Sequence, residues 1–351
     1  GIPAAAAVGT VAGDADAELE VISRVAQAQI AETAAYLDST PIAVHCVDTP
    51  HIFDIQITAF HGEDSAFVRI VDYHTNLVCI RRNGETLLEK ECVTREDGLI
   101  GRSCLSVEGI VAFADTVNLG NVQEVLERQI AYNMDIAEEG LRGNYGANIG
   151  STILLGRESD INCKMRAWAA AASDARMNGC EKPVVINSGS GNQGITASVP
   201  VVIYAKELGV SEEKMYRALA LSNLTAIHQK TPIGRLSAFC GAISAGVGAG
   251  AGISYLKGGD YKVLIHTVVN ALAIVSGIVC DGAKASCAAK IATAVEAGIM
   301  GYDMYMCGQE FHAGDGLVGA GVEANIQNVG RLAKDGMKET NQEIIKIMIG
   351  C

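Results

Sequence analysis

Two cysteines stand seven residues apart in the segment GIVCDGAKASCAAK, residues 277–290. If this segment is one helix, Cys280 and Cys287 lie on the same face, about 10 Å apart. That separation is too long for one tetrahedral zinc ion and for a disulfide. A helix break at Asp281 and Gly282 would bring the thiols closer, and a metal cluster could bridge a wider gap than one ion. Spacing alone favours two buried thiols, because free cysteine is among the most often buried residue types.

A glycine- and serine-rich segment, NSGSGNQG at residues 187–194, stands just before a predicted helix. Exposed backbone N–H groups at a helix N-terminus bind anions, and amide side chains can orient the ligand. A flexible connector is equally compatible with this composition. The segment lacks the Lys-Ser/Thr of a P-loop and the strand–glycine–helix unit of a dinucleotide site. The candidate substrate-binding residues of this loop are Ser188, Gly189, Ser190, Asn192 and Gln193.

A third polar segment, AIHQKTPIGRLSAFCG at residues 226–241, contains His228, Lys230, Arg235 and Cys240 around a Pro-Ile-Gly break. A helix that ends at Lys230 and restarts near Gly234 would point these side chains into one pocket. The alternative is a surface corner with solvated cations, which is favoured for any single residue and less so for the whole set.

Composition limits the classes of protein. A chain of 351 residues is long enough for two domains, and 49% apolar residues can form real cores. The formal net charge of −13 argues against nucleic acid as a partner, because phosphates repel an acidic surface. Eleven cysteines spread over this length, without a legible signal peptide, indicate a reducing, cytoplasmic setting. The chain starts at Gly1 rather than Met, and we expect an upstream segment to be missing.

The pattern of elements predicts an α+β protein. Apolar spacing predicts a helix over 15–37, and short β-rich runs predict an antiparallel sheet with one solvated face over 41–93. From Ser106 onward the pattern is helical, with central helices at 236–256 and 263–280 that are buried on every side. His266 and Asn270 within the second of these favour a buried helix over a membrane span. We expect an α+β domain over 1–145 and an all-α domain over 146–351.

Four segments together resemble a known family: SGSGNQG, GRLSAFCG, CDGAKASC and the tail GDGLVGAGVEANIQNVGRLAKDGM. They look like the L-cysteine desulfidase family, which is similar to the alpha region of bacterial iron–sulfur L-serine dehydratases. The resemblance implies that Cys240, Cys280 and Cys287 hold a 4Fe–4S cluster. Three thiolates leave one iron without a protein ligand, and such an iron is a Lewis acid that can take a substrate group.

The sequence departs from that family in one respect. Family members carry a Gly-Cys-Thr-Glu-Pro motif near their N-terminus, whose cysteine is thought to act in proton transfer, and the motif is absent here. The catalytic base is therefore unassigned, with His228, Lys230 and Cys351 as candidates. In the related serine dehydratases a terminal cysteine occupies the fourth iron. Cys351 is expected either to do the same or to end a frayed tail.

The chemistry that the resemblance implies is β-elimination from L-cysteine, independent of pyridoxal phosphate, to give pyruvate, ammonia and sulfide. The alternatives are the same scaffold acting on L-serine, and a non-enzymatic protein that carries a cluster. The candidate anion donors for the substrate carboxylate are the loop at 187–194 with Lys230 and Arg235. The expected partners are a small amino acid and further copies of this chain, without nucleic acid or membrane, in cytoplasmic amino-acid catabolism.

Overall fold

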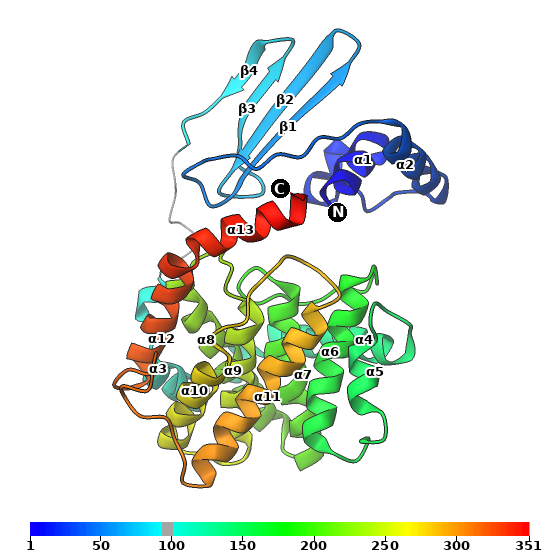
Figure 1. Cartoon of the computed structure of the whole chain (residues 1–351). Helices are drawn as coiled ribbons and strands as arrows, with labels where there is room; N and C mark the ends of the chain where they lie inside the picture. The colour runs from blue at the N-terminus through cyan, green and yellow to red at the C-terminus, as the bar shows by residue number, and fades with distance from the viewer. Residues whose placement is uncertain (93–100, 351) are drawn as a thin grey trace. The chain divides into compact units, whose positions relative to one another are not determined.

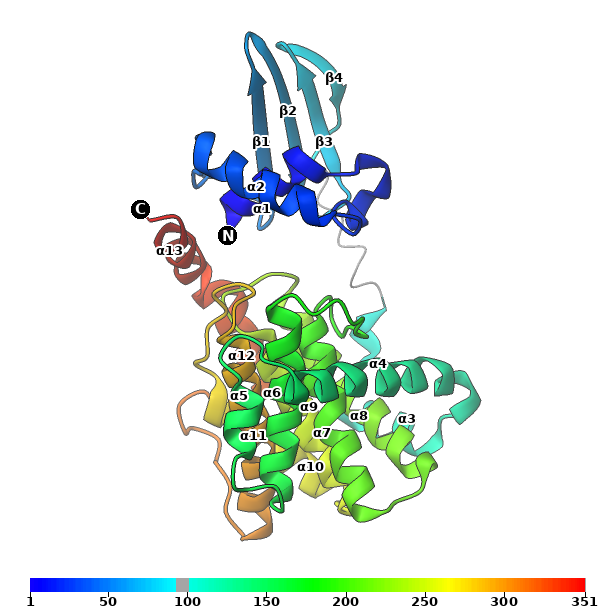
Figure 2. The ribbon, with the colours of Figure 1, turned by 90° about the vertical axis from the view of Figure 1, so that its right-hand side faces the viewer.

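The computed structural model describes residues 1–92 and 101–350, with the side chain of residue 19 left aside (Figures 1 and 2). Within these residues the chain forms two compact units. The first comprises residues 1–92 with 343–350, and the second comprises residues 101–342. The architecture is α+β, as the sequence predicts, with one antiparallel sheet followed by helices.

The first unit begins with helices. They are α1 (Ile2–Ala12), the 3₁₀ helix η1 (Ala15–Glu20) and α2 (Gln27–Ser39). The prediction of one helix over 15–37 is wrong in its first half. The chain turns after η1, and α2 starts only where the Gln29 side chain accepts a hydrogen bond from the Ala26 N–H (2.9 Å).

The sheet of the first unit is a four-stranded antiparallel meander in the order β1-β2-β3-β4. Its strands are β1 (Asp54–His61), β2 (Asp64–Val71), β3 (Leu77–Arg82) and β4 (Glu85–Glu89). The antiparallel sheet is confirmed, but residues 41–48 form no strand. The expected burial of alternate residues fails in β1, where Ile55 and Ile57 are both exposed.

The second unit is helical. Its elements are η3 (Arg102–Cys104), α3 (Val107–Thr116), η4 (Leu119–Asn121), α4 (Gln123–Arg142), α5 (Ile149–Leu154), α6 (Ile161–Met177), α7 (Gly191–Leu208), α8 (Glu212–Ile233), α9 (Gly241–Leu256), α10 (Tyr261–Val275), α11 (Cys287–Met306), α12 (Val322–Arg331), the π-helical turn η5 (Leu332–Gly336) and the start of α13 (Lys338–Ile349). No helix among the described residues has the length and apolar character needed to cross a membrane.

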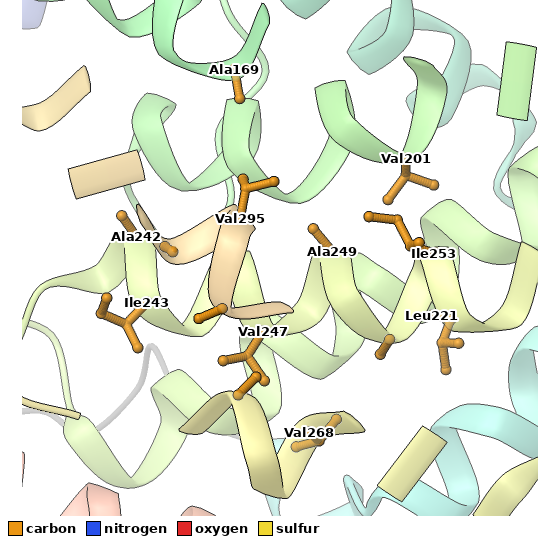
Figure 3. Packing of buried hydrophobic residues seen from close by; sticks show 14 of the residues in the cluster. Ala169, Val201, Leu221, Ala242, Ile243, Val247, Ala249, Ile253, Val268 and Val295 are labelled. Carbon is orange, nitrogen blue, oxygen red and sulfur yellow. The ribbon is translucent and has the colours of Figure 1, made fainter. Parts of the chain in front are cut away.

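Helix α9 is the centre of this unit. Every residue from Ala242 to Ser254 is buried, and α7, α8, α10 and α11 pack around it. Figure 3 shows Ile243, Val247 and Ile253 of α9 among side chains that belong to the surrounding helices. Glycine allows the close approach, because a Cβ atom added at Gly246 would lie 2.5 Å from the Ala294 backbone of α11.

Two expectations for the helical region differ from the structure. Helix α9 is buried all round as predicted, whereas α10 exposes Tyr261 and Ile274, so it is not buried on every side. The described residues of the first unit end at 92 and those of the helical unit begin at 101, whereas the sequence placed a domain boundary at 145. The reason for this difference is that α3 and α4 contribute buried side chains to the helical core, where α3 packs on α8 and α4 packs on α6 and α7.

Candidate functional site

A short β-bridge brings the first two predicted cysteines together. Phe239 pairs with Val279, the Cys240 N–H donates to the Ile278 carbonyl (3.1 Å), and the Cys280 N–H donates to the Ala238 carbonyl (2.6 Å). Side chains alternate along extended chains, so Cys240 and Cys280 leave this bridge on the same face, opposite to Phe239 and Val279. The 39 residues between Cys240 and Cys280 therefore close into a loop that contains α9 and α10.

Helix packing brings the third cysteine to the same end of the unit. Gly246 lies against Ala294 and Gly250 lies against Gly298, so α9 and α11 run parallel with a constant offset. Extending that offset toward the N-termini places Cys240 opposite residue 288, next to Cys287, where α11 begins. Burial is the main reason that the pKa of the Cys240 thiol is raised, and Cys280 and Cys287 both lie close enough to raise it further.

The segment between Cys280 and Cys287 is not one helix. Gly282 has a φ of +90°, a left-handed conformation that favours glycine, and α11 starts only at Cys287. The break at Asp281 and Gly282, one of the possibilities left open by the sequence, is therefore present. The Cys287 thiol reaches back to the Gly282 carbonyl, with a distance of 3.5 Å from Sγ to O. The separation of about 10 Å expected for a continuous helix does not apply here.

Lys230 approaches the thiols from α8. Gly248 of α9 lies against Ser222 and Gly252 lies against Ala218, so α8 and α9 are antiparallel, and extending this pairing places Lys230 opposite Cys240. Its side chain is buried, with 6% exposure, and makes no hydrogen bond or ion pair with other described residues. Burial lowers the pKa of the Lys230 ammonium to about 8, although the sulfurs of Cys280 and Cys240 act in the opposite direction.

A second cation, Lys290, stands one turn into α11 and forms an ion pair with Asp281. The hydrogen bond from Lys290 is the main reason that the pKa of the Asp281 carboxyl is lowered. The Lys290 ammonium also interacts electrostatically with Cys240 and Cys287. Lys230 of α8 therefore lies near Cys240 and Cys280, and Lys290 of α11 lies near Cys240 and Cys287.

The glycine- and serine-rich loop forms the N-terminal end of α7. Asn187 and Ser190 exchange backbone hydrogen bonds of 3.0 and 3.1 Å, and the two residues between them, Ser188 and Gly189, both have positive φ. This is a tight two-residue hairpin turn, so the flexible-connector interpretation does not hold. No side chain caps α7 at Ser190, and its first backbone N–H groups have no intrahelical partner.

Gln193 connects this loop to the thiols. A Cβ atom added at Gly241, the residue after Cys240, would lie 2.5 Å from the Gln193 amide nitrogen. Gln193 is buried, and its Oε1 atom has no hydrogen-bond partner among the described residues. The N-termini of α7, α9 and α11 thus meet at one end of the helical unit, and each contributes a partial positive charge there.

Arg176 is a site residue that the sequence analysis missed. It stands in the last turn of α6, its Nη1 donates to Asn192 Oδ1 (3.3 Å), and its guanidinium packs against Gly191, the first residue of α7. Burial lowers the pKa of the Arg176 guanidinium, and Cys287 is the group that offsets this shift. The sequence signal was weak, because Arg176 lies in a plain helical run that belongs to none of the motifs.

Two other predicted residues, His228 and Arg235, do not join this cluster. His228 is two residues from Lys230, so it faces the other side of α8, where its Nε2 pairs with Glu323 Oε2 of α12 (2.7 Å). Helix α8 continues to Ile233 rather than ending at Lys230, and Arg235 is exposed in the turn after it. The proposed pocket of four side chains is therefore reduced to Lys230 and Cys240. Cys351 lies outside the described residues.

The donor set fits a cluster better than a single ion. Among the described residues no group of three or more His, Cys, Asp or Glu side chains is placed to hold one metal ion. Three thiols from the bridge and from α11 nevertheless meet at one place, and thiolates are the ligands of iron–sulfur clusters. Burial raises the pKa of the Cys240 thiol to about 11, so thiolate formation there requires a positive partner such as iron.

Comparison with known proteins gives the family. The model of the serine dehydratase alpha chain matches residues 16–346. A UPF0597 protein of Desulfitobacterium hafniense is 55% identical over 350 residues, which cover 99% of this chain and 81% of the relative. UPF0597 proteins of Lachnoclostridium phytofermentans and Treponema denticola are 48% and 42% identical, with 99% of this chain covered in both cases and 84% and 83% of the relatives.

The family-model match over residues 16–346 indicates the class of dehydratase-type lyases. The chain belongs to the serine dehydratase alpha chain family.

Proposed function

We propose that this protein is an iron–sulfur-dependent lyase that carries out β-elimination on L-cysteine and yields pyruvate, ammonia and sulfide. The observation that carries the proposal is the meeting of Cys240, Cys280 and Cys287 at the N-terminal ends of α9 and α11, beside the loop that begins α7. Family membership supports the lyase class, and the choice of L-cysteine rests on the motif resemblance.

In this proposal the three cysteines hold a 4Fe–4S cluster, which supplies an iron with an open position and therefore Lewis acidity toward the substrate. The residues of the chain supply the surroundings. Lys230 and Lys290 place positive charge beside the thiolates and stabilise their ionised form. The loop at 187–194 presents N–H groups and the Asn192 and Gln193 amides to a bound anion.

The reaction requires three chemical events. A base takes the proton from Cα, and the electron pair of that C–H bond forms a double bond between Cα and Cβ. The bond from Cβ to sulfur breaks, and its electron pair leaves with the sulfur as sulfide. The aminoacrylate then tautomerises, and water releases ammonia and pyruvate. Of the candidate bases His228, Lys230 and Cys351, Lys230 lies near Cys240 and Cys280, and its lowered pKa makes the neutral amine, the form that can accept a proton, more accessible than in an ordinary lysine. His228 is engaged by Glu323 on the far side of α8.

A second candidate substrate is L-serine, which the family description favours because it names a serine dehydratase. Elimination from L-serine follows the same course, with hydroxide in place of sulfide as the leaving group. One anaerobic assay of reconstituted protein separates the two substrates, with pyruvate and sulfide measured independently. Faster pyruvate release from L-cysteine, with equal sulfide, supports the proposal. Pyruvate from L-serine but not from L-cysteine would make L-serine the substrate. No product from either amino acid would refute the lyase function.

A further inference from the structure

Arg176 has an unusual electrostatic position. Its guanidinium lies against the first residue of α7, whose N-terminus carries partial positive charge and has no side-chain cap. Its only hydrogen-bond partner among the described residues is the neutral Asn192 amide, and no carboxylate there pairs with it. Two positive groups side by side are unfavourable unless an anion lies between them.

Other polar groups at this place also lack partners. Gln193 is 94% buried, yet its Oε1 atom accepts no hydrogen bond from a described residue. Lys230 is equally buried and makes no hydrogen bond or ion pair within the described part of the chain. Buried polar groups in native proteins are normally paired, so unpaired ones at a common place indicate a missing ligand. The ligand needs a negative group for the cations and a donor for the Gln193 oxygen.

We infer that Arg176, held by Asn192 at the uncapped N-terminus of α7, binds the α-carboxylate of the substrate, and that Gln193 Oε1 accepts from its α-ammonium group. In this inference, the identification of the ligand as a substrate rests on the proposed function. The binding of a carboxylate by Arg176 and of an ammonium group by Gln193 does not. It makes a free carboxylate the feature that selects substrates, since an arginine fork and helix N–H groups together match the two carboxylate oxygens.

The neighbouring cations are less suitable for this role. Lys290 already pairs with Asp281. Lys230 lies beside Cys240 and Cys280 and has no planar fork. The alternative is a purely structural role for Arg176, because a cation in the last turn of α6 interacts favourably with the carbonyl end of that helix. Ligand binding separates the two roles, because a structural arginine would affect stability rather than the choice of ligand.

The test uses three small probes that undergo no elimination. L-Alanine has both the carboxylate and the ammonium group, ethylamine lacks the carboxylate, and propionate lacks the ammonium group. Binding is measured by calorimetry on the full chain, both before and after anaerobic cluster reconstitution. We expect wild-type protein to bind L-alanine more tightly than ethylamine, and Arg176→Gln to weaken L-alanine binding by about tenfold or more. Arg176→Lys should lie between the two, because it keeps the charge but loses the fork.

Arg166 provides a matched control. It stands on the same helix, about 15 Å farther along α6, and pairs with Glu296 (2.6 Å). Arg166→Gln should leave L-alanine affinity unchanged. The inference is overturned if Arg176→Gln and Arg176→Lys bind L-alanine as tightly as wild type, if ethylamine binds as tightly as L-alanine, or if L-alanine does not bind at all. Arg176→Lys carries the test alone should Arg176→Gln fail to fold.

Measurements of turnover and KM distinguish a failure of this inference from a failure of the proposed function. If L-alanine binding depends on Arg176 but neither L-cysteine nor L-serine is converted, the recognition site stands and the lyase proposal fails. If either substrate is converted and Arg176→Gln leaves its KM unchanged, the lyase proposal stands and the recognition site fails.

Discussion

The first unit and the helical unit each contain a partly buried arginine, and the two differ in their partners. In the sheet, Arg69 of β2 donates from Nε and Nη2 to both oxygens of Asp54 in β1 (3.0 and 2.6 Å). In the helical unit, Arg176 has a neutral amide as its hydrogen-bond partner and no carboxylate among the described residues. Arg69 completes a bidentate pair that holds two strands together.

The comparison extends to the thiols. Cys79 of β3 is buried in the sheet unit, whereas Cys240, Cys280 and Cys287 meet at one end of the helical unit. A buried group whose interactions are complete stabilises the fold. A buried polar group that lacks a hydrogen-bond or ion-pair partner within the protein is available to bind a ligand. By this criterion the region of Arg69 in the sheet unit is structural, and the end formed by α7, α9 and α11 is the binding site that we propose.

The largest effect is expected from the thiols. Cys240→Ser, Cys280→Ser and Cys287→Ser should each reduce anaerobic lyase turnover to the level of protein without cluster, because serine does not replace a thiolate ligand of iron. Cys79→Ser is the control for loss of a buried sulfur, and it should keep wild-type turnover per folded molecule. Equal losses in all four variants would show that the effect comes from folding rather than from ligation.

The next largest effect is expected in the free energy of unfolding of the cluster-free protein. Arg69→Met leaves the Asp54 carboxylate without its main partner, and it should destabilise the sheet unit by about 1–3 kcal/mol. Lys230→Met removes an ammonium group that is already unfavourable, as its lowered pKa shows, so it should leave the stability of the helical unit unchanged or raise it. Hydrogen exchange resolves the two units separately. Strong destabilisation by Lys230→Met would mean that Lys230 has a structural partner.

The smallest effect is a pH dependence in the sheet. Hydrogen bonding from Arg69 lowers the pKa of the Asp54 carboxyl below its ordinary value of 3.8. A lowered pKa in the folded state means that the stabilisation is complete above that ordinary value and is lost as the pH falls through the folded pKa. Asp54→Asn should therefore lower the protection of sheet amides by about 1 kcal/mol at pH 7. The difference from wild type should shrink below pH 4, and a constant difference would show that ionisation is not involved.

The sequence was informative where a pattern reports a local physical preference. Apolar runs located α9 and most of the strands, and the Gly–Ser segment located the N-terminus of α7. Positive φ at Ser188 and Gly189 gives that segment its turn, which composition alone could not separate from a flexible connector. The resemblance of separate motifs connected Cys240 with Cys280 and Cys287, and the bridge between Phe239 and Val279 is the contact that joins their segments.

The other features of the fold and of the candidate site could not be predicted from the sequence, because they depend on tertiary contacts. Arg176 becomes a site residue only because α6 ends beside α7, and nothing in its own helix marks it. His228 and Lys230 looked equivalent in sequence, but α8 is continuous through both, so they face opposite sides. The boundary expected at 145 followed a change of pattern near a loop, whereas the compact units follow the burial of α3 and α4 against later helices.

The most direct test of the central claim is the iron and acid-labile sulfide content of anaerobically reconstituted protein, measured together with its absorption near 400 nm. Wild-type protein and Cys79→Ser should each hold about four irons and four sulfides per chain, and the variants of Cys240, Cys280 and Cys287 should hold far less. A full cluster in all three of those variants, or none in wild-type protein, would contradict the assignment of this site.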